Sequence, residues 1–119
     1  RDGGGREAVR AVATTRYGYD VSETCDEIRR TNRFDETCQV TVPQSIVCFL
    51  ESTNFEQAVR LAISIGGDSD TIAAMTGSLA EAFYGIPDAI ARQALACLTQ
   101  EMRDVVIPFI AQRPIQLIR

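Results

Sequence analysis

The sequence predicts an all-α protein. Apolar residues recur at spacings of three and four along most of the chain, and no segment shows the alternation typical of a half-buried strand. Glycine and proline residues separate the periodic segments, as expected at helix ends. Because 119 residues fit one domain, we expect a single compact multi-helix orthogonal bundle over residues 1–119, with residues 113–119 as a tail.

The first two helices are expected over residues 7–15 and about 20–30. The first is expected to close before Tyr17-Gly18-Tyr19. Asp20 followed three residues later by Glu23 has the form of a capping box and predicts the start of the second helix. The polar residues 31–39 indicate a loop.

The third and fourth helices have recognisable boundaries. Thr41 is expected to cap the third helix, with Pro43 in its first turn, where a missing backbone N–H does no harm. Asn54 with Gln57 marks the start of the fourth helix. Residues 66–67, both glycine, end it.

The fifth helix is expected from Asp70 to about Tyr84, and one of its sides carries only small residues. These residues are Ala73, Ala74, Gly77 and Ala80. A small-residue side lets a neighbouring backbone come close, which suggests a central, buried helix. Two further amphipathic helices are expected over residues 88–97 and 99–110, with Pro108 kinking or ending the last one.

Composition excludes several classes of protein. The formal net charge is −4 and no Lys/Arg cluster occurs, which argues against nucleic acid as a partner. No apolar run approaches the length of a membrane span, and there is no signal-peptide h-region. The chain has no His, and its four Cys residues are far apart, which argues against zinc. We expect free, mostly buried thiols and a cytoplasmic protein without a membrane partner.

The most informative segment is Gly66–Gly85. Its two glycines precede Asp68, Asp70 and Thr71, where the fifth helix begins. An Asp at this position can cap a helix, but two carboxyls and a hydroxyl supply more oxygen than one cap requires. No Lys or Arg lies between Arg60 and Arg92 to pair with them. Because hard oxygen ligands suit Mg²⁺ or Mn²⁺, we interpret the segment as part of a metal site.

Two other metal motifs fit this segment less well. An EF-hand needs Gly and Glu at the sixth and twelfth loop positions, where Ala73 and Leu79 stand. A haloacid-dehalogenase motif has one residue between the second Asp and the Thr, whereas Thr71 follows Asp70 directly.

The run Gly-Gly-Asp-Ser-Asp-Thr-Ile-Ala-Ala-Met-Thr-Gly-Ser-Leu-Ala-Glu-Ala-Phe-Tyr-Gly resembles the C-terminal metal motif of the ADP-ribosylglycohydrolase family, which includes the dinitrogenase-reductase-activating glycohydrolase. Weaker similarity extends upstream through Phe34 and residues 38–39, 41–44 and 54–58. The resemblance implies the helical fold of that family, with two Mg²⁺ or Mn²⁺ ions in a central cleft. It also implies hydrolysis of the glycosidic bond in ADP-ribosylated substrates.

The resemblance also implies roles for particular residues. The metal ligands would be Asp68, Asp70 and Thr71, and the residues near the ions and the ADP-ribose would be Gly66, Gly67, Ser69, Thr41 and Gln44. Capping and first-turn chemistry is the competing interpretation for Thr41 and Gln44. No catalytic acid or base is identified in this segment.

One departure from the family matters for activity. Family members are longer, and their N-terminal half carries an adjacent Asp-Asp pair beside Thr or Ser, which this chain lacks. Three protein oxygen ligands do not hold two divalent ions firmly. We therefore expect the C-terminal part of a hydrolase, inactive alone, with the N-terminal half of the enzyme as its partner. Two alternatives stay open: a non-catalytic module that binds a partner or ADP-ribose, and a small bundle in which the Asp pair only caps a helix.

Overall fold

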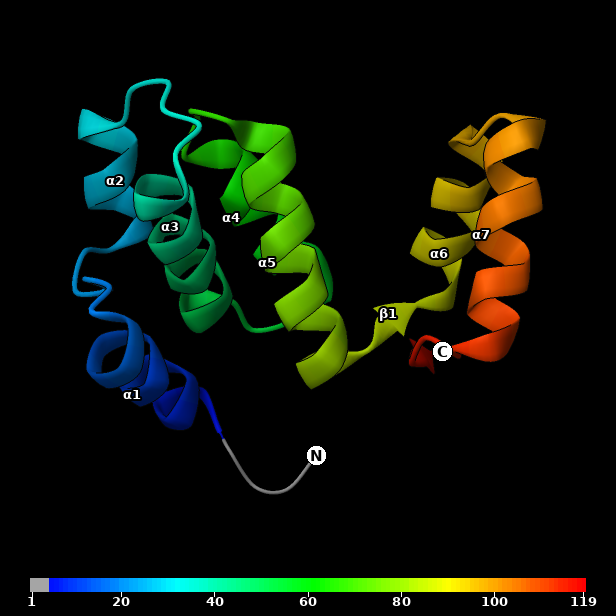
Figure 1. Ribbon diagram of the computed structural model, residues 1–119, viewed down its shortest axis with the longest axis horizontal. Coiled ribbons are helices and arrows are strands. Elements are labelled where there is room, and N and C mark those ends of the chain that lie inside the picture. The colour runs from blue at the N-terminus through cyan, green and yellow to red at the C-terminus, as the bar shows by residue number, and fades with distance from the viewer. Residues whose placement is uncertain (1–4) are drawn as a thin grey trace.

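A computed structural model describes residues 5–119, and the helices of this range follow one another along most of the chain (Figure 1). The helices are α1 (Arg6–Tyr17), α2 (Cys25–Thr31), α3 (Cys38–Glu51), α4 (Phe55–Ser64), α5 (Ser69–Tyr84), α6 (Asp88–Cys97) and α7 (Gln100–Gln112). Two short strands, β1 (Ile86–Pro87) and β2 (Leu117–Ile118), complete the described elements. The all-α prediction is confirmed.

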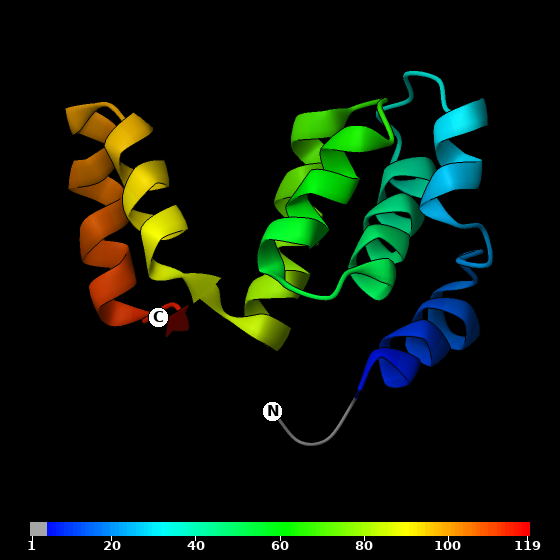
Figure 2. The same ribbon diagram turned by 180° about the vertical axis from the view of Figure 1, so that it is seen from behind.

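Helices α1 to α5 form one body, whereas α6 and α7 form a pair that projects away from it (Figures 1 and 2). The strands β1 and β2 pair in parallel at the base of this projection, so β2 lies within the segment 113–119 that was expected as a tail. The radius of gyration is 15.0 Å, compared with about 13.5 Å for a compact domain of this length. The projecting pair explains the difference.

Helix α5 is the central helix of the body and packs on α3 and α4. Its buried side chains Ile72, Thr76 and Ala80 lie one turn apart on one face. The Thr76 hydroxyl donates to the Ser45 carbonyl of α3 at 3.1 Å, so this buried polar group is satisfied. The prediction of a central helix is therefore confirmed.

The start of α2 differs from the prediction. The capping box consists of Thr24 and Glu27, not Asp20 and Glu23: the Thr24 hydroxyl accepts from the Glu27 N–H at 3.2 Å, and the Glu27 carboxylate accepts from the Thr24 N–H at 2.7 Å. The Asp20 carboxylate instead accepts from the Ser22 N–H at 2.9 Å. This local turn keeps residues 20–23 outside the helix.

The start of α3 also differs. The N-cap is Thr37, whose backbone N–H donates to the Asp35 carboxylate at 2.8 Å, so the helix begins before the expected position. Thr41 therefore lies inside the helix, 1% exposed, and its hydroxyl donates to the Thr37 carbonyl at 3.0 Å. The capping role predicted for Thr41 is wrong, and Pro43 lies within α3 rather than in its first turn.

Most other boundaries agree with the sequence. The Asn54 side chain accepts from the Gln57 N–H at 2.8 Å and caps α4, as expected. Helix α7, however, continues past Pro108, so this proline does not end it. None of the helices in residues 5–119 has the length and apolar character needed to cross a bilayer.

The four cysteines carry free thiols, as expected. Cys25 and Cys48 are buried, whereas Cys38 and Cys97 are exposed, so the expectation of mostly buried thiols holds for two of the four. The sulfur atoms of Cys25 and Cys48 are 3.8 Å apart, too far for a covalent bond.

Candidate metal and substrate site

The candidate site begins at the glycine turn between α4 and α5. Gly66 and Gly67 have φ angles of +74° and +75°, the left-handed region that favours glycine. The Ser69 N–H donates to the Gly67 carbonyl at 3.0 Å and closes the turn. The turn leads directly into Asp68, the N-cap residue of α5.

Two carboxyl groups lie beside each other after this turn. Asp68 occupies the N-cap position, yet its side chain makes no cap hydrogen bond to the first turn of α5. Hydrogen bonding with the Asp68 carboxyl, and then from the N–H groups of Thr71 and Asp70 itself, lowers the pKa of the exposed Asp70 carboxyl. The positive end of the helix dipole also favours negative charge here.

Neither carboxylate has a basic partner within residues 5–119. The salt bridges of this range are Asp26 with Arg29, Glu56 with Arg60, and Asp88 with Arg92. This agrees with the absence of Lys and Arg from the surrounding sequence. The negative charge of the Asp68–Asp70 pair is therefore not neutralised by the described part of the protein.

Thr71 completes the predicted ligand set. It is exposed, in contrast to the next residue, Ile72, which is 0% exposed and anchors the first turn of α5 in the core. Within the described chain no hydrogen bond engages the Thr71 hydroxyl. Three oxygen-bearing side chains thus stand at the surface end of α5, and this donor set suits a hard divalent cation.

The described residues supply only part of a coordination sphere. In residues 5–119 no group of three or more His, Cys, Asp or Glu side chains is placed to hold a metal ion. Magnesium takes about six oxygen ligands. Asp68, Asp70 and Thr71 therefore fit a divalent cation only if further ligands come from elsewhere.

The two candidate residues of α3 have different surroundings. The Gln44 side chain donates to the Asn32 Oδ1 at 2.9 Å, and the Asn32 Nδ2 donates to the Ile65 carbonyl at 2.9 Å, beside the glycine turn. Gln44 is thus connected to the turn through Asn32. Thr41 instead is buried in the core at 1% exposure.

Asn32 is the residue that sequence reasoning missed. It lies in the polar segment 31–39, where nothing in the local pattern distinguishes one Asn from its neighbours. Its partner Ile65 is 33 residues away in the sequence. Only the folded arrangement of α2 against the end of α4 reveals the contact.

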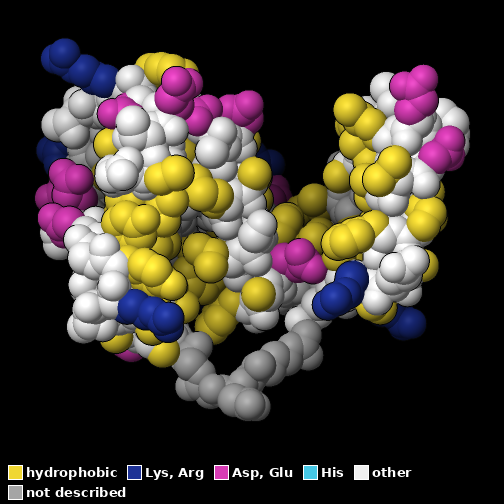
Figure 3. Space-filling view, in the orientation of Figure 1, with side chains coloured by type: hydrophobic (Ala, Val, Ile, Leu, Met, Phe, Trp, Pro, Cys, Tyr) yellow, Lys and Arg dark blue, Asp and Glu magenta, His cyan; other side chains and the backbone are white. Residues whose placement is uncertain are grey.

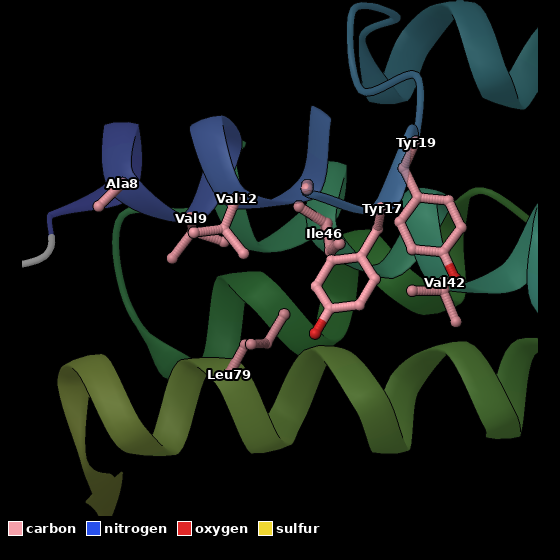
Figure 4. Close-up of a pocket in the computed structure, with 9 residues that line it drawn as sticks. Ala8, Val9, Val12, Tyr17, Tyr19, Val42, Ile46 and Leu79 are labelled. Carbon is pink, nitrogen blue, oxygen red and sulfur yellow. The ribbon is translucent and has the colours of Figure 1, made fainter. Parts of the chain in front are cut away.

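An apolar groove runs between α1, α3 and α5, and Figure 3 shows hydrophobic side chains gathered on one face of the molecule. The groove has a volume of about 490 Å³ and is lined by Ala8, Val9, Val12, Ala13, Tyr17, Tyr19, Val42, Ile46 and Leu79 (Figure 4). None of these residues is charged. Leu79 lies about 13 Å from Asp70 along α5. The groove therefore suits packing against another apolar surface rather than binding of a metal or a diphosphate.

Comparisons with known proteins agree with the motif. The model of the ADP-ribosylglycohydrolase family matches residues 4–117. ADP-ribosylhydrolase ARH3 of Bos taurus is 32% identical over 77 residues, which cover 56% of this chain and 21% of that protein. The ARH3 proteins of Homo sapiens and Mus musculus are 31% and 32% identical over 77 residues, with the same coverage. The chain thus spans about a fifth of the length of these relatives. No solved structure matches it.

Proposed function

Because this chain belongs to the ADP-ribosylglycohydrolase family, we propose that it forms the C-terminal part of a metal-dependent ADP-ribosyl hydrolase. The observation that carries the proposal is the Asp68–Asp70 pair at the N-terminus of α5. Neither carboxyl has a salt bridge in the described chain, and the Asp68 side chain makes no cap hydrogen bond. The substrate class is ADP-ribose joined to another group through a glycosidic bond.

In this proposal Asp68, Asp70 and Thr71 hold Mg²⁺ or Mn²⁺ in one wall of the active site. When bound, such ions orient the hydroxyls of the substrate and stabilise negative charge that develops on oxygen. Gly66 and Gly67 are proposed to lie near the ions; at Gly66, where a Cβ would meet nothing within 4 Å, a sugar or phosphate can approach the backbone closely. Ser69 and Gln44 are proposed to lie near the bound ADP-ribose.

The other wall is proposed to come from the N-terminal half of the same enzyme. Two acids and one hydroxyl do not complete a two-ion site, so the isolated chain is expected to be inactive. The apolar groove and the exposed side chains of α7, among them Val105 and Phe109 at 71% and 64% exposure, offer surfaces against which that half can pack. The whole enzyme is proposed to act in the cytoplasm.

Metal binding by the chain can be tested without activity. In a titration with Mn²⁺ we expect paramagnetic broadening of backbone amide NMR signals centred on residues 67–72, with the weak affinity of an incomplete site. Asp70→Asn should remove it. The matched control is Glu101→Gln, because Glu101 is the second residue of α7 as Asp70 is of α5, and it is also exposed. Broadening that survives Asp70→Asn, or that is equally strong around Glu101, would contradict the metal site.

Hydrolysis is tested in the enzyme encoded by the parent gene. That enzyme should release ADP-ribose from an ADP-ribosylated peptide, and Asp70→Asn should lower kcat/KM by at least about a hundredfold, whereas Glu101→Gln should leave it unchanged. An Asp-Asp-Thr-like triplet is expected upstream in that gene or in a companion chain. If the wild-type enzyme binds ADP-ribose without any hydrolysis, the non-catalytic alternative replaces the proposal.

A further inference from the structure

Asn32 connects helices α2, α3 and α4 beside the glycine turn that precedes Asp68 and Asp70. It is the C-cap residue of α2, and both ends of its side-chain amide are engaged. The Nδ2 donates to the carbonyl of Ile65, the C-cap residue of α4, and the Oδ1 accepts from Gln44 of α3, each at 2.9 Å. Figures 1 and 2 show the segment after α2 beside the turn between α4 and α5.

The glycine turn passes directly against this amide. A Cβ atom on Gly67 would lie 2.9 Å from the Asn32 Nδ2 and 3.6 Å from the Arg33 carbonyl, whereas one on Gly66 would meet nothing within 4 Å. Gly67 therefore needs to be glycine for two reasons, its φ angle and this contact. The position of Asn32 sets how close the backbone of the turn can come.

Helix α2 also contacts the end of α4 at a second position, through Arg29. Arg29, one turn before Asn32, donates to the Ser64 carbonyl at 3.1 Å and to the Ser64 hydroxyl at 2.7 Å. The last turn of α4 is thus fixed before the chain reaches the glycines. Asn32 then contacts Ile65 and Gly67.

The far side of the carboxylate pair is fixed by the core. Ile72 is fully buried, and its N–H donates to the Asp68 carbonyl at 3.0 Å. The Asp68 and Asp70 side chains therefore stand between two anchors, Ile72 in the core and Asn32 against the turn. A change at Asn32 alters one anchor while leaving the other in place.

We infer that Asn32 is a positioning residue for Asp68 and Asp70, which it places through its contact with Gly67, and that Gln44 holds the amide of Asn32 in the required orientation. This inference rests on the proposed function. Residues that orient metal ligands without touching the metal commonly change metal affinity by about 10- to 100-fold. Asn32 has the contacts for such a role.

The experiment compares Asn32→Ala with Asn54→Ala in the same Mn²⁺ titration of the full chain. Asn54 also supplies an amide hydrogen bond at a helix end, but it caps the start of α4, about 15 Å along the helix from the glycine turn. Both variants should lower the melting temperature. Only Asn32→Ala should weaken Mn²⁺ binding, by about tenfold.

Two further measurements separate positioning from simple loss of stability. Hydrogen exchange at the Ser69 N–H, which bonds the Gly67 carbonyl, should accelerate in Asn32→Ala and stay unchanged in Asn54→Ala. The cost of Gly67→Ala should also depend on Asn32. The substitution should lower the melting temperature less in the Asn32→Ala variant than in the wild type, because the Asn32 Nδ2 that a Cβ on residue 67 would meet is then absent. Should Asn32→Ala fail to fold, Gln44→Met removes only the supporting bond and should weaken Mn²⁺ binding about threefold.

The outcomes distinguish the two proposals. If Asp70→Asn abolishes Mn²⁺ binding while Asn32→Ala binds Mn²⁺ like the wild type, or Asn54→Ala loses as much affinity, the metal site stands and the positioning role is overturned. If the wild-type chain shows no Mn²⁺ broadening that depends on Asp70, the proposed metal site fails, and the role of Asn32 fails with it.

Discussion

The phenolic hydroxyl of Tyr84 donates a hydrogen bond of 2.6 Å to the backbone carbonyl of Ser52. Ser52 is 0% exposed, and its own hydroxyl lies 3.1 Å from the Tyr84 oxygen. The bond joins the last turn of α5 to the end of α3. A buried carbonyl therefore depends for its donor on a side chain 32 residues away.

Tyr84→Phe should destabilise the protein through this carbonyl. Loss of a donor to a buried acceptor costs about 1–3 kcal/mol, and we expect the free energy of unfolding in urea to fall by that amount. Tyr17→Phe is the control, because Tyr17 is 60% exposed, and it should change the free energy by less than about 0.5 kcal/mol. Equal effects of the two variants would show that the Tyr84 hydroxyl contributes nothing specific.

The capping box of α2 should respond to acid. The backbone N–H of Thr24, followed by its hydroxyl, lowers the pKa of the Glu27 carboxyl below its usual 4.5. Because the folded pKa is the lower one, this stabilisation is complete above the unfolded pKa and disappears as the pH falls through the folded pKa. NMR of the Thr24 amide should follow this loss. Glu27→Gln should remove the titration, and an unchanged pH profile in that variant would refute the assignment.

The thiols should divide into two reactivity classes. The hydrogen bond with Cys48, followed by burial, raises the pKa of the Cys25 thiol, so its reactive thiolate is scarce. We expect N-ethylmaleimide to modify Cys38 and Cys97 in the native protein and all four cysteines in urea. Mass spectrometry of tryptic peptides provides the measurement. Rapid labelling of Cys25 under native conditions would contradict the packing of α2 on α3.

Alanine substitutions at two glycines should lower the free energy of unfolding by different amounts. Both Gly18 and Gly85 have positive φ angles, +69° and +80°, so alanine is strained at either position. A Cβ on Gly18 would meet nothing within 4 Å, whereas one on Gly85 would lie 2.9 Å from Ile118 Cγ2 and 3.0 Å from the Gln116 carbonyl. Gly18→Ala should cost about 1–2 kcal/mol.

Gly85→Ala should also separate β2 from β1. Hydrogen exchange at the Ile86 N–H, which donates to the Gln116 carbonyl at 2.7 Å, reports this separation directly. Faster exchange is expected in Gly85→Ala and not in Gly18→Ala. The same exchange rate in both variants would mean that the strand pairing does not depend on the missing side chain.

Local patterns predicted the features that depend on neighbours in sequence. Asn54 caps α4 through Gln57 only three residues later, and the glycine turn places Asp68 and Asp70 at the start of α5, as the motif indicated. Such features need no knowledge of the rest of the fold. The family, the helical class and the segment that carries the carboxylate pair could all be read from the sequence.

Contacts between elements far apart in the sequence determine where α2 begins, and these contacts could not be predicted from the sequence. The capping box of α2 was predicted at Asp20, whereas the structure has it at Thr24. The Val21 carbonyl accepts from Arg10 of α1 at 2.7 Å, and the Cys25 N–H donates to Glu51 of α3 at 3.0 Å. In a helix starting at residue 20 these two backbone groups would bond each other. Their partners in α1 and α3 therefore select the later start.

In the candidate site, too, the residues close in sequence could be predicted and the contacts between distant elements could not. Asp68, Asp70 and Thr71 are neighbours in sequence and were identified together, whereas Asn32 reaches the turn only through the packing of α2 on α4. The apolar groove likewise takes its lining from three helices. No local pattern encodes either feature.

The projection of α6 and α7 has a consequence for how this protein can evolve. Every residue of the main buried cluster of the described chain lies between Ala13 and Ala80, so the core ends before β1 begins. The α6–α7 pair can then open as a cooperative unit of its own, without disturbing α1 to α5. Mutations can therefore accumulate in α6 and α7 under weak constraint from the core, while the turn that carries Asp68 stays tied to it.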